Sequence, residues 1–348
     1  MTHKGGIIGF GGMGSWHYEH AKETPVNYVA VYDVDPERLK VAREQGLKAY
    51  ETLEAFLADD SFDVVLVSTP NNFHHDMVVA ALEAGKNVVC EKPVAMSSAE
   101  LLDMTAAAER AGKVFTIHQN RRWDADLDIV RRAIDQDLLG ELFTVESRVH
   151  GQNGAMYGWR AFKVAGGGMM LDWGVHQIDQ LIHLFGRKVE SVFCTMASIK
   201  TREVEDYFKL IIRMKEGPTL QIETGTYNLI QMPRWYVCGS KGALQIDTWG
   251  KPGKVVRATK EEFEWTPVIL HTAAGPTRTM SPRPKDTLEE LEIPEQWPDW
   301  RDFYRNVAAV IDGEAKELLV KPDEALYVMR IMEAAFKSAE TGEAVTFE

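Results

Sequence analysis

Three side chains able to hold or move a proton stand out in the chain: Lys92, Asp172 and His176. Asp172 and His176 are four residues apart and Asp179 follows, so a helix beginning near Asp172 would carry all three on one face. An imidazole suits a proton acceptor, a carboxylate can orient it or hold a hydroxyl group, and an ammonium stabilises charge on oxygen. The set therefore suits proton removal from an alcohol, with Asp179 as a supporting or structural residue.

The same helix also allows a metal-site interpretation. Asp172, His176, Asp179 and His183 fall on neighbouring turns and offer mixed oxygen and nitrogen donors, which zinc or manganese accept. No clear ligand comes from elsewhere in the sequence, and hydride transfer between carbons needs no metal. The sequence therefore favours a site without metal.

A glycine-rich run follows the first apolar segment and opens a helical pattern; it reads Gly9, Phe10, Gly11, Gly12, Met13, Gly14. Gly9 permits a tight turn, Gly11 lets the backbone approach a pyrophosphate, and Gly14 lets the helix pack close to the strand. The free N–H groups of the helix N-terminus would face the phosphates. The run predicts a dinucleotide site.

Asp33 ends the next predicted strand, Val26–Tyr32. A carboxylate at this position accepts hydrogen bonds from the adenosine ribose and repels a 2′-phosphate. The following residues, Val34, Asp35 and Pro36, supply no cation. The cofactor expected here is NAD rather than NADP.

The first third of the chain alternates short apolar runs with helical patterns, which is typical of a doubly wound parallel sheet. The predicted strands are Gly5–Gly9, Val26–Tyr32, Val64–Ser68, Asn87–Glu91 and Val114–His118. The predicted helices between them include Pro36–Gln45, Phe73–Ala84 and Ser98–Ala111.

After about Trp123 the pattern changes to a mainly antiparallel sheet with helices on one side. The predicted strands are Leu142–Gly151, Val189–Ile199, Phe208–Met214, Thr219–Tyr227, Trp235–Cys238 and Ala243–Thr248. The predicted helices are Asp124–Gln136, Val175–Phe185, Trp300–Ile311 and Glu324–Ser338, while Gly250–Trp300 is expected to be irregular. The fold class is therefore α/β, with a Rossmann-like domain over residues 1–122 and an α+β domain over residues 123–348.

Composition narrows the class of protein. The chain has 348 residues, and its 39 Lys and Arg against 52 Asp and Glu give a formal net charge of −13, which disfavours nucleic acid. The one basic candidate, Arg121 with Arg122, is too short for such a surface. No apolar run is long enough to span a membrane, and no secretion signal is evident. The three cysteines lack metal-type spacing and cannot all pair, which fits a reduced cytoplasm.

Further segments carry a family resemblance. They are Ser68-Thr69-Pro70-Asn71 with His74, Ala84-Gly85-Lys86, Glu91-Lys92-Pro93, Trp159-Arg160, and Gly166-Gly167-Gly168 with Asp172, Gly174, His176 and Asp179. Together with the glycine run they resemble the Gfo/Idh/MocA oxidoreductases, from Gly6 to about Ser338. The run from Gln119 to Asp124 is similar to the branch that contains scyllo-inositol and related polyol or sugar dehydrogenases.

The resemblance implies a Rossmann domain, a large open and mainly antiparallel sheet, and an active site in the cleft between them. It also implies homodimers or homotetramers formed through the sheet. It makes Lys92 a catalytic residue. Beside the glycine run and Asp33, it gives a set of cofactor-facing residues: Thr69, Pro70, Asn71, His74, Glu91, Lys92, Gln119, Trp159 and Arg160. Substrate hydroxyls could be bound by Gln119, Arg122, Tyr157 and Lys163.

The expected function is NAD-dependent hydride transfer at a hydroxyl-bearing carbon of a sugar, polyol or glycoside. His176 would take the proton, Lys92 would support the oxygen, and Asp172 would fix the orientation. One alternative is a redox-neutral enzyme of the same fold that uses NAD to assist glycoside cleavage. A second is an NAD-binding sensor without catalysis, against which the intact set of Lys92, Asp172 and His176 argues.

Overall fold

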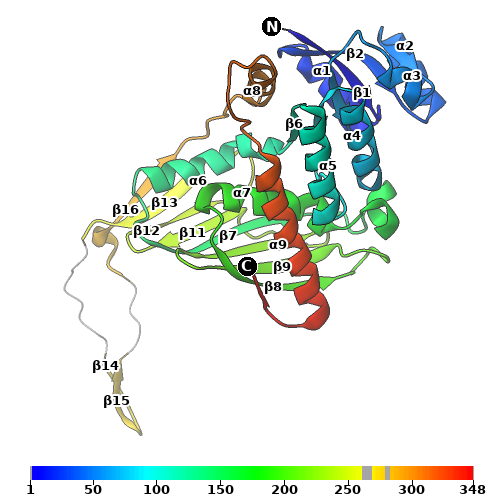
Figure 1. Ribbon diagram of the computed structural model, residues 1–348. Coiled ribbons are helices and arrows are strands. Elements are labelled where there is room, and N and C mark those ends of the chain that lie inside the picture. The colour runs from blue at the N-terminus through cyan, green and yellow to red at the C-terminus, as the bar shows by residue number, and fades with distance from the viewer. Residues whose placement is uncertain (1, 261–268, 279–282, 348) are drawn as a thin grey trace.

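The computed structural model describes residues 2–260, 269–278 and 283–347. Within these ranges, no helix combines the length and the apolar character needed to cross a membrane. Two sheets and the helices around them make up most of the described structure (Figure 1).

The N-terminal unit is built on a six-stranded parallel sheet. Every residue of its central strands β4 and β5 is buried, as expected for strands covered on both faces. The strands are β1 (His3–Ile8), β2 (Val26–Tyr32), β3 (Lys48–Tyr50), β4 (Val64–Val67), β5 (Asn87–Cys90) and β6 (Phe115–Ile117). Their order in the sheet is β3-β2-β1-β4-β5-β6.

Helices connect these strands, and local sequence signals set their ends. They are α1 (Gly12–Ala21), α2 (Pro36–Glu44), α3 (Leu53–Leu57), α4 (His74–Glu83) and α5 (Ser98–Ala111). The Asp35 side chain accepts the Glu37 N–H at the start of α2, and Ser97 accepts the Glu100 N–H at the start of α5. Gly112, in the left-handed region, ends α5.

The strand order determines where a ligand can bind. The chain runs outward from β1 to β3 and then returns to β4 beside β1, so the winding direction reverses between β1 and β4. Open parallel sheets bind ligands outside the carboxyl ends of their strands at such a reversal. Gly9 follows β1, Ser68 follows β4 and Glu91 follows β5, which brings three predicted motifs to one edge.

The second unit is a nine-stranded sheet in the order β16-β13-β12-β11-β7-β10-β9-β8-β17. Its strands are β7 (Leu142–His150), β8 (Val189–Ala197), β9 (Tyr207–Met214), β10 (Thr219–Gly225), β11 (Trp235–Gly239), β12 (Gly242–Ile246), β13 (Gly253–Ala258), β16 (Leu288–Ile293) and β17 (Val345–Thr346). Neighbouring strands are antiparallel except β7 and β10, which are parallel. The predicted mainly antiparallel sheet is confirmed.

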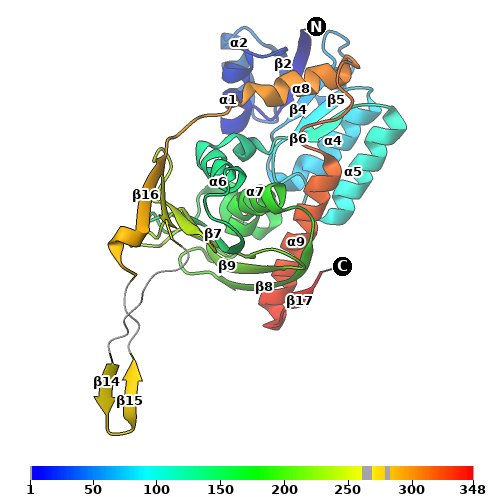
Figure 2. The same ribbon diagram turned by 90° about the vertical axis from the view of Figure 1, so that its left-hand side faces the viewer.

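Helices cover one face of this sheet. They are α6 (Ala125–Asp135), α7 (Val175–Phe185) and α9 (Pro322–Thr341), and Figure 1 shows all three on the same side. Helix α8 (Arg301–Ile311) instead packs on the N-terminal unit, as Figure 2 shows. There the Tyr304 hydroxyl bonds to His17 of α1, and the rings of Trp300 and Trp16 lie 5.7 Å apart.

The prediction of irregular structure over Gly250–Trp300 is wrong for much of that range. It contains β13 and β16, which pair with each other and extend the large sheet beyond β12. Strands β14 (Ile269–Thr272) and β15 (Gly275–Arg278) form a hairpin that stands apart from the body (Figure 2). Three of the six residues of β16 are glutamates, so the strand contains no apolar run long enough to mark it by itself. Residues 261–268 and 279–282 lie outside the described ranges.

Candidate functional site

A cavity of about 810 Å³ lies at the carboxyl ends of β1, β4 and β5. Its wall includes Asp33 and residues from five predicted motifs. These wall residues are Gly9, Gly11, Gly12, Met13, Asp33, Thr69, Pro70, Asn71, His74, Glu91, Lys92, Trp159, Arg160 and Asp172. The structure thus brings most of the predicted cofactor residues to one cavity, although they come from distant parts of the chain.

The glycine run has the backbone that a dinucleotide cradle requires. Gly9 has φ +91°, in the left-handed region that favours glycine. A methyl group on Gly14 would lie 2.2 Å from the Gly9 carbonyl oxygen, so helix and strand could not pack as they do. At Gly11 and Gly12 no described atom lies within 4 Å of the position a side chain would take. This open space before the N-terminus of α1 fits a pyrophosphate.

Asp33 lies beside the glycine run. Its Oδ2 accepts the Phe10 N–H at 2.6 Å, and its Oδ1 accepts the Asp35 N–H at 2.9 Å. The Phe10 side chain is fully buried, so Phe10 contributes its backbone rather than its ring. Arg38 of α2 also lines this cavity, a cation that the sequence analysis did not consider.

The segment after β4 forms the opposite wall. His74 is buried and hydrogen-bonds through its two ring nitrogens to the carbonyl oxygens of Pro93 and Thr69, each at 2.9 Å. Asn71 donates to the Gly166 carbonyl oxygen at 2.7 Å. These bonds fix the wall against the Lys92 segment and against the glycines before α7.

Lys92 and Asp172 meet where the two units join. Lys92 Nζ lies 2.8 Å from the Asp172 carbonyl oxygen and 3.1 Å from Asp172 Oδ1. Arg160 Nε lies 3.3 Å from Asp172 Oδ2. Burial favours the neutral acid, but the nearby charges of Lys92 and Arg160 hold the pKa of Asp172 below its ordinary value. Asp172 is therefore a carboxylate between two cations.

His176 follows Asp172 by one turn, but the turn is unusual. Met170–Gly174 forms a π-helical turn that continues directly into α7, a feature often found at functional sites. His176 is 4% exposed, and its Nδ1 has no hydrogen-bond partner among the described residues. Burial, followed by the charges of Lys92 and Arg121, lowers the pKa of His176 well below its ordinary value. The ring is therefore neutral at pH 7.

A second cavity of about 680 Å³ adjoins the first and shares Arg160 and Asp172 with it. Aromatic side chains are prominent in its wall: Tyr157, Trp173, Trp249 and Trp297. The Arg121 guanidinium lies 4.3 Å from the centroid of the Trp173 ring. His150 and Thr226 add polar side chains to this wall.

Sequence reasoning missed most residues of this second cavity. Arg121 and Trp173 sit inside motifs that were recognised, so proximity to the motifs was an available signal. His150 lies at the end of a predicted strand, and Trp249 and Trp297 lie beside or inside Gly250–Trp300, where no motif marks them.

Two predicted substrate residues lie elsewhere. Arg122 is buried and pairs with Asp179 at 2.6 and 2.8 Å and with Glu324 at 2.8 Å, so its charge is already neutralised inside the protein. This corrects the substrate role and gives Asp179 the structural role left open for it. Lys163 is exposed and lies outside the described walls of both cavities.

The other two predicted substrate residues differ in solvent exposure: Gln119 is buried and Tyr157 is exposed. Gln119 is 2% exposed and does not contribute to the described wall of either cavity, because the chain turns inward after β6. Tyr157 is 92% exposed and lines the second cavity. Of the substrate-contact predictions, only Tyr157 lies where a ligand of that cavity could reach it.

A Rossmann cradle facing a lysine–aspartate pair defines an NAD-binding oxidoreductase fold. Residues 3–119 match the oxidoreductase family with an NAD-binding Rossmann fold, and residues 127–245 match the GFO/IDH/MocA C-terminal domain. The chain belongs to the Gfo/Idh/MocA oxidoreductase family.

Individual relatives agree with this assignment. The structure of an NAD-binding protein from Listeria innocua has 41% sequence identity and a TM-score of 0.93, and the match covers 99% of both chains. An uncharacterized oxidoreductase of Schizosaccharomyces pombe is 32% identical over 86% of this chain and 85% of its own length. The scyllo-inositol 2-dehydrogenase (NADP(+)) IolW of Bacillus subtilis is 26% identical over 100% of this chain and 96% of its own.

Proposed function

We propose that the protein oxidises, or in reverse forms, a hydroxyl-bearing carbon of a sugar, polyol or glycoside with NAD as the hydride partner. The observation that carries the proposal is the Lys92–Asp172 contact at the junction of the two cavities. The first cavity has the cradle for a dinucleotide, and the second is placed to hold the molecule that reacts with it.

Each residue of the pair has a distinct task. Lys92, as an ammonium, stabilises negative charge on the reacting oxygen. Asp172 holds that ammonium at 3.1 Å and so directs it toward the junction of the cavities. Neutral His176, one turn after Asp172, is the acceptor that we assign to the hydroxyl proton; it lies outside the described walls of both cavities, and its Nδ1 is buried without a partner among the described residues. Bound NAD would supply the hydride acceptor.

The second cavity has the character of a carbohydrate site. Its indole rings offer flat apolar surfaces for the C–H face of a sugar ring, and Arg121, Arg160 and Asp172 offer hydrogen bonds for hydroxyl groups. Two of the relatives carry names of the same kind, IolW and a myo-inositol 2-dehydrogenase of Thermotoga maritima that is 29% identical over 70% of this chain.

The test is a screen followed by one substitution. Purified protein is incubated with NAD and a panel of inositols, aldoses, glycosides and sugar acids, and NADH is read by absorbance. Lys92→Met is expected to lower kcat by about 10²- to 10⁴-fold while NADH affinity, read by fluorescence titration, stays within about threefold.

Lys215→Met is the matched control, because Lys215 is exposed in the turn between β9 and β10. It should turn over the substrate like the parent protein. The absence of NADH production across the whole panel, or full activity in Lys92→Met, would overturn the proposal. Cleavage of a chromogenic glycoside without net NADH would favour the redox-neutral alternative.

The organisation of the chain supports three further parts of the proposal. The boundary between the units falls near 122/123, just before α6. The three cysteines, Cys90, Cys194 and Cys238, are all buried and free, which agrees with a reducing, cytoplasmic setting.

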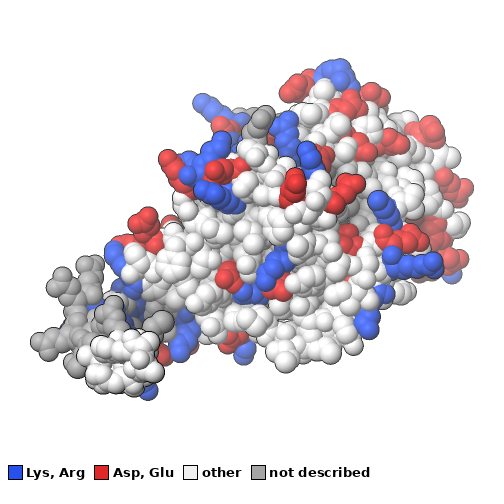
Figure 3. All heavy atoms as spheres, turned by 90° about the horizontal axis from the view of Figure 1, so that it is seen from below, with Lys and Arg blue, Asp and Glu red and all other residues white. Residues whose placement is uncertain are grey.

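The third part concerns assembly, for which the large sheet offers a surface. The face opposite α6, α7 and α9 carries broad areas without Lys, Arg, Asp or Glu (Figure 3). Phe193 and Ile211 lie directly opposite each other there, and Tyr236 lies further along the same row. We assign this face to contact between copies of the chain in a homodimer or homotetramer.

A further inference from the structure

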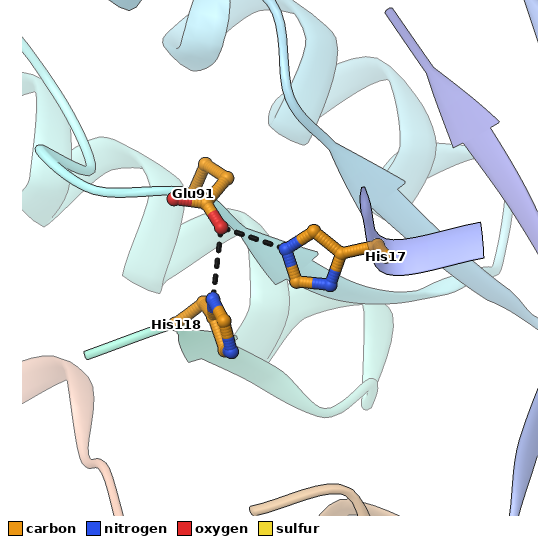
Figure 4. Close-up of side chains that lie close together, drawn as sticks. All are labelled: His17, Glu91 and His118. Atoms are coloured by element: carbon orange, nitrogen blue, oxygen red, sulfur yellow. Dashed lines mark hydrogen bonds and ion pairs between the residues drawn. The ribbon is translucent and has the colours of Figure 1, made fainter. Parts of the chain in front are cut away.

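Three buried side chains, His17, Glu91 and His118, meet at the residue that precedes Lys92 in the chain (Figure 4). Glu91 Oε1 lies 2.7 Å from His17 Nε2 and 2.8 Å from His118 Nδ1. His17 is 0% exposed, Glu91 5% and His118 2%. The proposed hydride chemistry gives no task to either histidine, so the cluster needs its own explanation.

The protonation states in the cluster follow from burial and from the hydrogen bonds. Burial and the charge of His118 lower the pKa of His17 to about 4, so the ring is neutral at pH 7. Burial raises the pKa of the Tyr304 phenol well above its ordinary value, so the phenol keeps its proton and donates to His17 Nδ1. His17 Nε2 therefore carries the ring proton and donates to Glu91.

Glu91 is the anion at the centre. Burial alone would raise its pKa, but the charge and hydrogen bond of His118 and the hydrogen bond of His17 hold the pKa well below its ordinary value. Its second oxygen, Oε2, accepts the backbone N–H of Lys92 at 3.2 Å. One carboxylate thus accepts from His17, His118 and Lys92.

These contacts join four segments of the chain. His17 lies on α1, whose first residue, Gly12, belongs to the glycine run, and His118 directly follows β6. Tyr304 belongs to α8, far along the sequence. All of these contacts converge, directly or through His17, on Glu91, the residue before Lys92. A shift of α1, which begins in the glycine run, would therefore move the backbone of Lys92.

We propose that Glu91, held by His17 and His118, is a positioning residue that sets the Lys92 backbone so that its amine meets Asp172. This inference rests on the catalytic role proposed for Lys92. A carboxylate is required because a glutamine would turn an NH₂ group toward donors that need an acceptor. Misplacing a reacting group by about 1 Å can cost about 10²-fold in rate.

A buried metal ion is the competing explanation, because the three ligand atoms lie within 4.8 Å of one another. Against it, the separations of 2.7 and 2.8 Å are those of hydrogen bonds to a shared oxygen. The described residues also add no fourth His, Cys, Asp or Glu to the group. The hydrogen bonds already satisfy the carboxylate.

The experiment compares Glu91→Gln and His17→Gln with Tyr304→Phe, which removes the phenol that bonds to His17 and Tyr28 but leaves the three donors to Glu91 in place. Crystal structures with NADH should show the Lys92 Nζ–Asp172 Oδ1 separation, 3.1 Å here, lengthened in Glu91→Gln and His17→Gln and retained in Tyr304→Phe. With a substrate from the screen, kcat should fall about 10- to 100-fold in the first two, with KM for NAD within about threefold.

Two results would overturn the inference. In the first, Glu91→Gln lowers the melting temperature or the NADH affinity but leaves the Lys92–Asp172 contact and kcat unchanged. The cluster would then have only a structural role. The other is one equivalent of tightly bound metal in the purified protein that is lost in His118→Gln. If no alcohol in the screen is oxidised, the proposed function fails, but the crystallographic distance still decides the positioning role.

Discussion

The carboxylate of Asp33 is hydrogen-bonded to nearby backbone and also lines the dinucleotide cavity. It accepts N–H groups from Phe10 and Asp35 and lines the same wall as Arg38. Removing its negative charge in Asp33→Asn should weaken the rejection of a 2′-phosphate. We expect the ratio of kcat/KM for NADP to that for NAD to rise about tenfold, equivalent to about 1.4 kcal/mol.

Glu44→Gln is the control for this ratio, because Glu44 is exposed on α2 and lies outside the described wall of the first cavity. It should leave the cofactor ratio unchanged, whereas Arg38→Gln should lower the use of NADP in the Asp33→Asn background. An unchanged ratio in Asp33→Asn would show that other groups select the cofactor. Both cofactors are titrated at one saturating substrate concentration.

Buried neutral histidines make the fold sensitive to acid. His17 has a pKa of about 4, and the pKa of His176 is well below its ordinary value, in both cases chiefly because of burial. Between these pKa values and about 6.5 the unfolded chain binds more protons than the folded one, so stability falls as pH falls. At pH 5.5 His17 should remove about 1 kcal/mol of the free energy of unfolding relative to pH 7, and His176 acts in the same direction.

Thermal unfolding measured from pH 7 to pH 5 tests this prediction. His17→Gln should flatten the dependence of melting temperature on pH. His75→Gln should not, because His75 is partly exposed and its bonds to Asp76 and Asp103 raise its pKa despite burial. A melting temperature that stays constant through this range in the parent protein would contradict the account.

At the scale of elements, the sequence predicted best where one local pattern decides the structure. Ser98–Ala111 and Val175–Phe185 form helices with the predicted bounds, and Val26–Tyr32 forms the predicted strand. Strand β3 and helix α3 were not predicted, because three and five residues are too few for a periodic signal.

The site was partly predictable for a related reason. Motif residues at the ends of β1, β4 and β5 must share one edge in a parallel sheet, and they do. The ion pairs of Arg122 could not be predicted, because its partners Asp179 and Glu324 come from α7 and α9. Spacing along the chain does not show which helices pack against each other. Trp249 and Trp297 reach the second cavity through the same kind of long-range packing.

The Arg122 cluster joins α7 and α9 to the segment just after β6. Arg122→Met would leave Asp179 buried, 2% exposed, without its cation. The expected loss is about 3–5 kcal/mol of unfolding free energy, measured by denaturant titration. KM for the substrate should stay within about twofold at temperatures where the variant is folded, because Arg122 lies outside both described cavity walls.

Arg213→Met is the control, since Arg213 of β9 forms an exposed pair with Glu190 of β8, away from the Arg122 cluster. It should cost less than about 1 kcal/mol. The double variant Arg122→Met/Asp179→Leu should recover part of the stability by removing the stranded charge. A large rise in KM in Arg122→Met with unchanged stability would restore the substrate role.

At the scale of the whole molecule, we expect the uncovered sheet face to form the contact between copies of the chain. A row of side chains crosses it from β8 to β12, through Phe193, Ile211, Gln221, Glu146, Tyr236 and Gln245. Placing charge in the row with Phe193→Glu/Ile211→Glu would bury unpaired carboxylates in any contact between copies. We expect light scattering coupled to gel filtration to show an oligomer for the parent and a monomer for this variant.

Phe336→Glu is the control, because Phe336 has the same 36% exposure as Phe193 but lies on α9, on the helical side. It should keep the parent mass. A parent protein that is monomeric at micromolar concentration, or an oligomer that survives the double substitution, would exclude this face.

Helix α8 has a consequence for the order in which the protein can be made. The N-terminal sheet is complete after β6, yet Phe303 and Tyr304, 2% and 0% exposed, come from a segment that leaves the ribosome much later. Until then the ring of His17 lacks its hydrogen bond to the Tyr304 phenol. The apolar surface of the N-terminal unit that α8 later covers stays exposed to solvent or to a chaperone. The N-terminal unit can therefore complete its packing only after most of the remaining chain, including α8, has been translated.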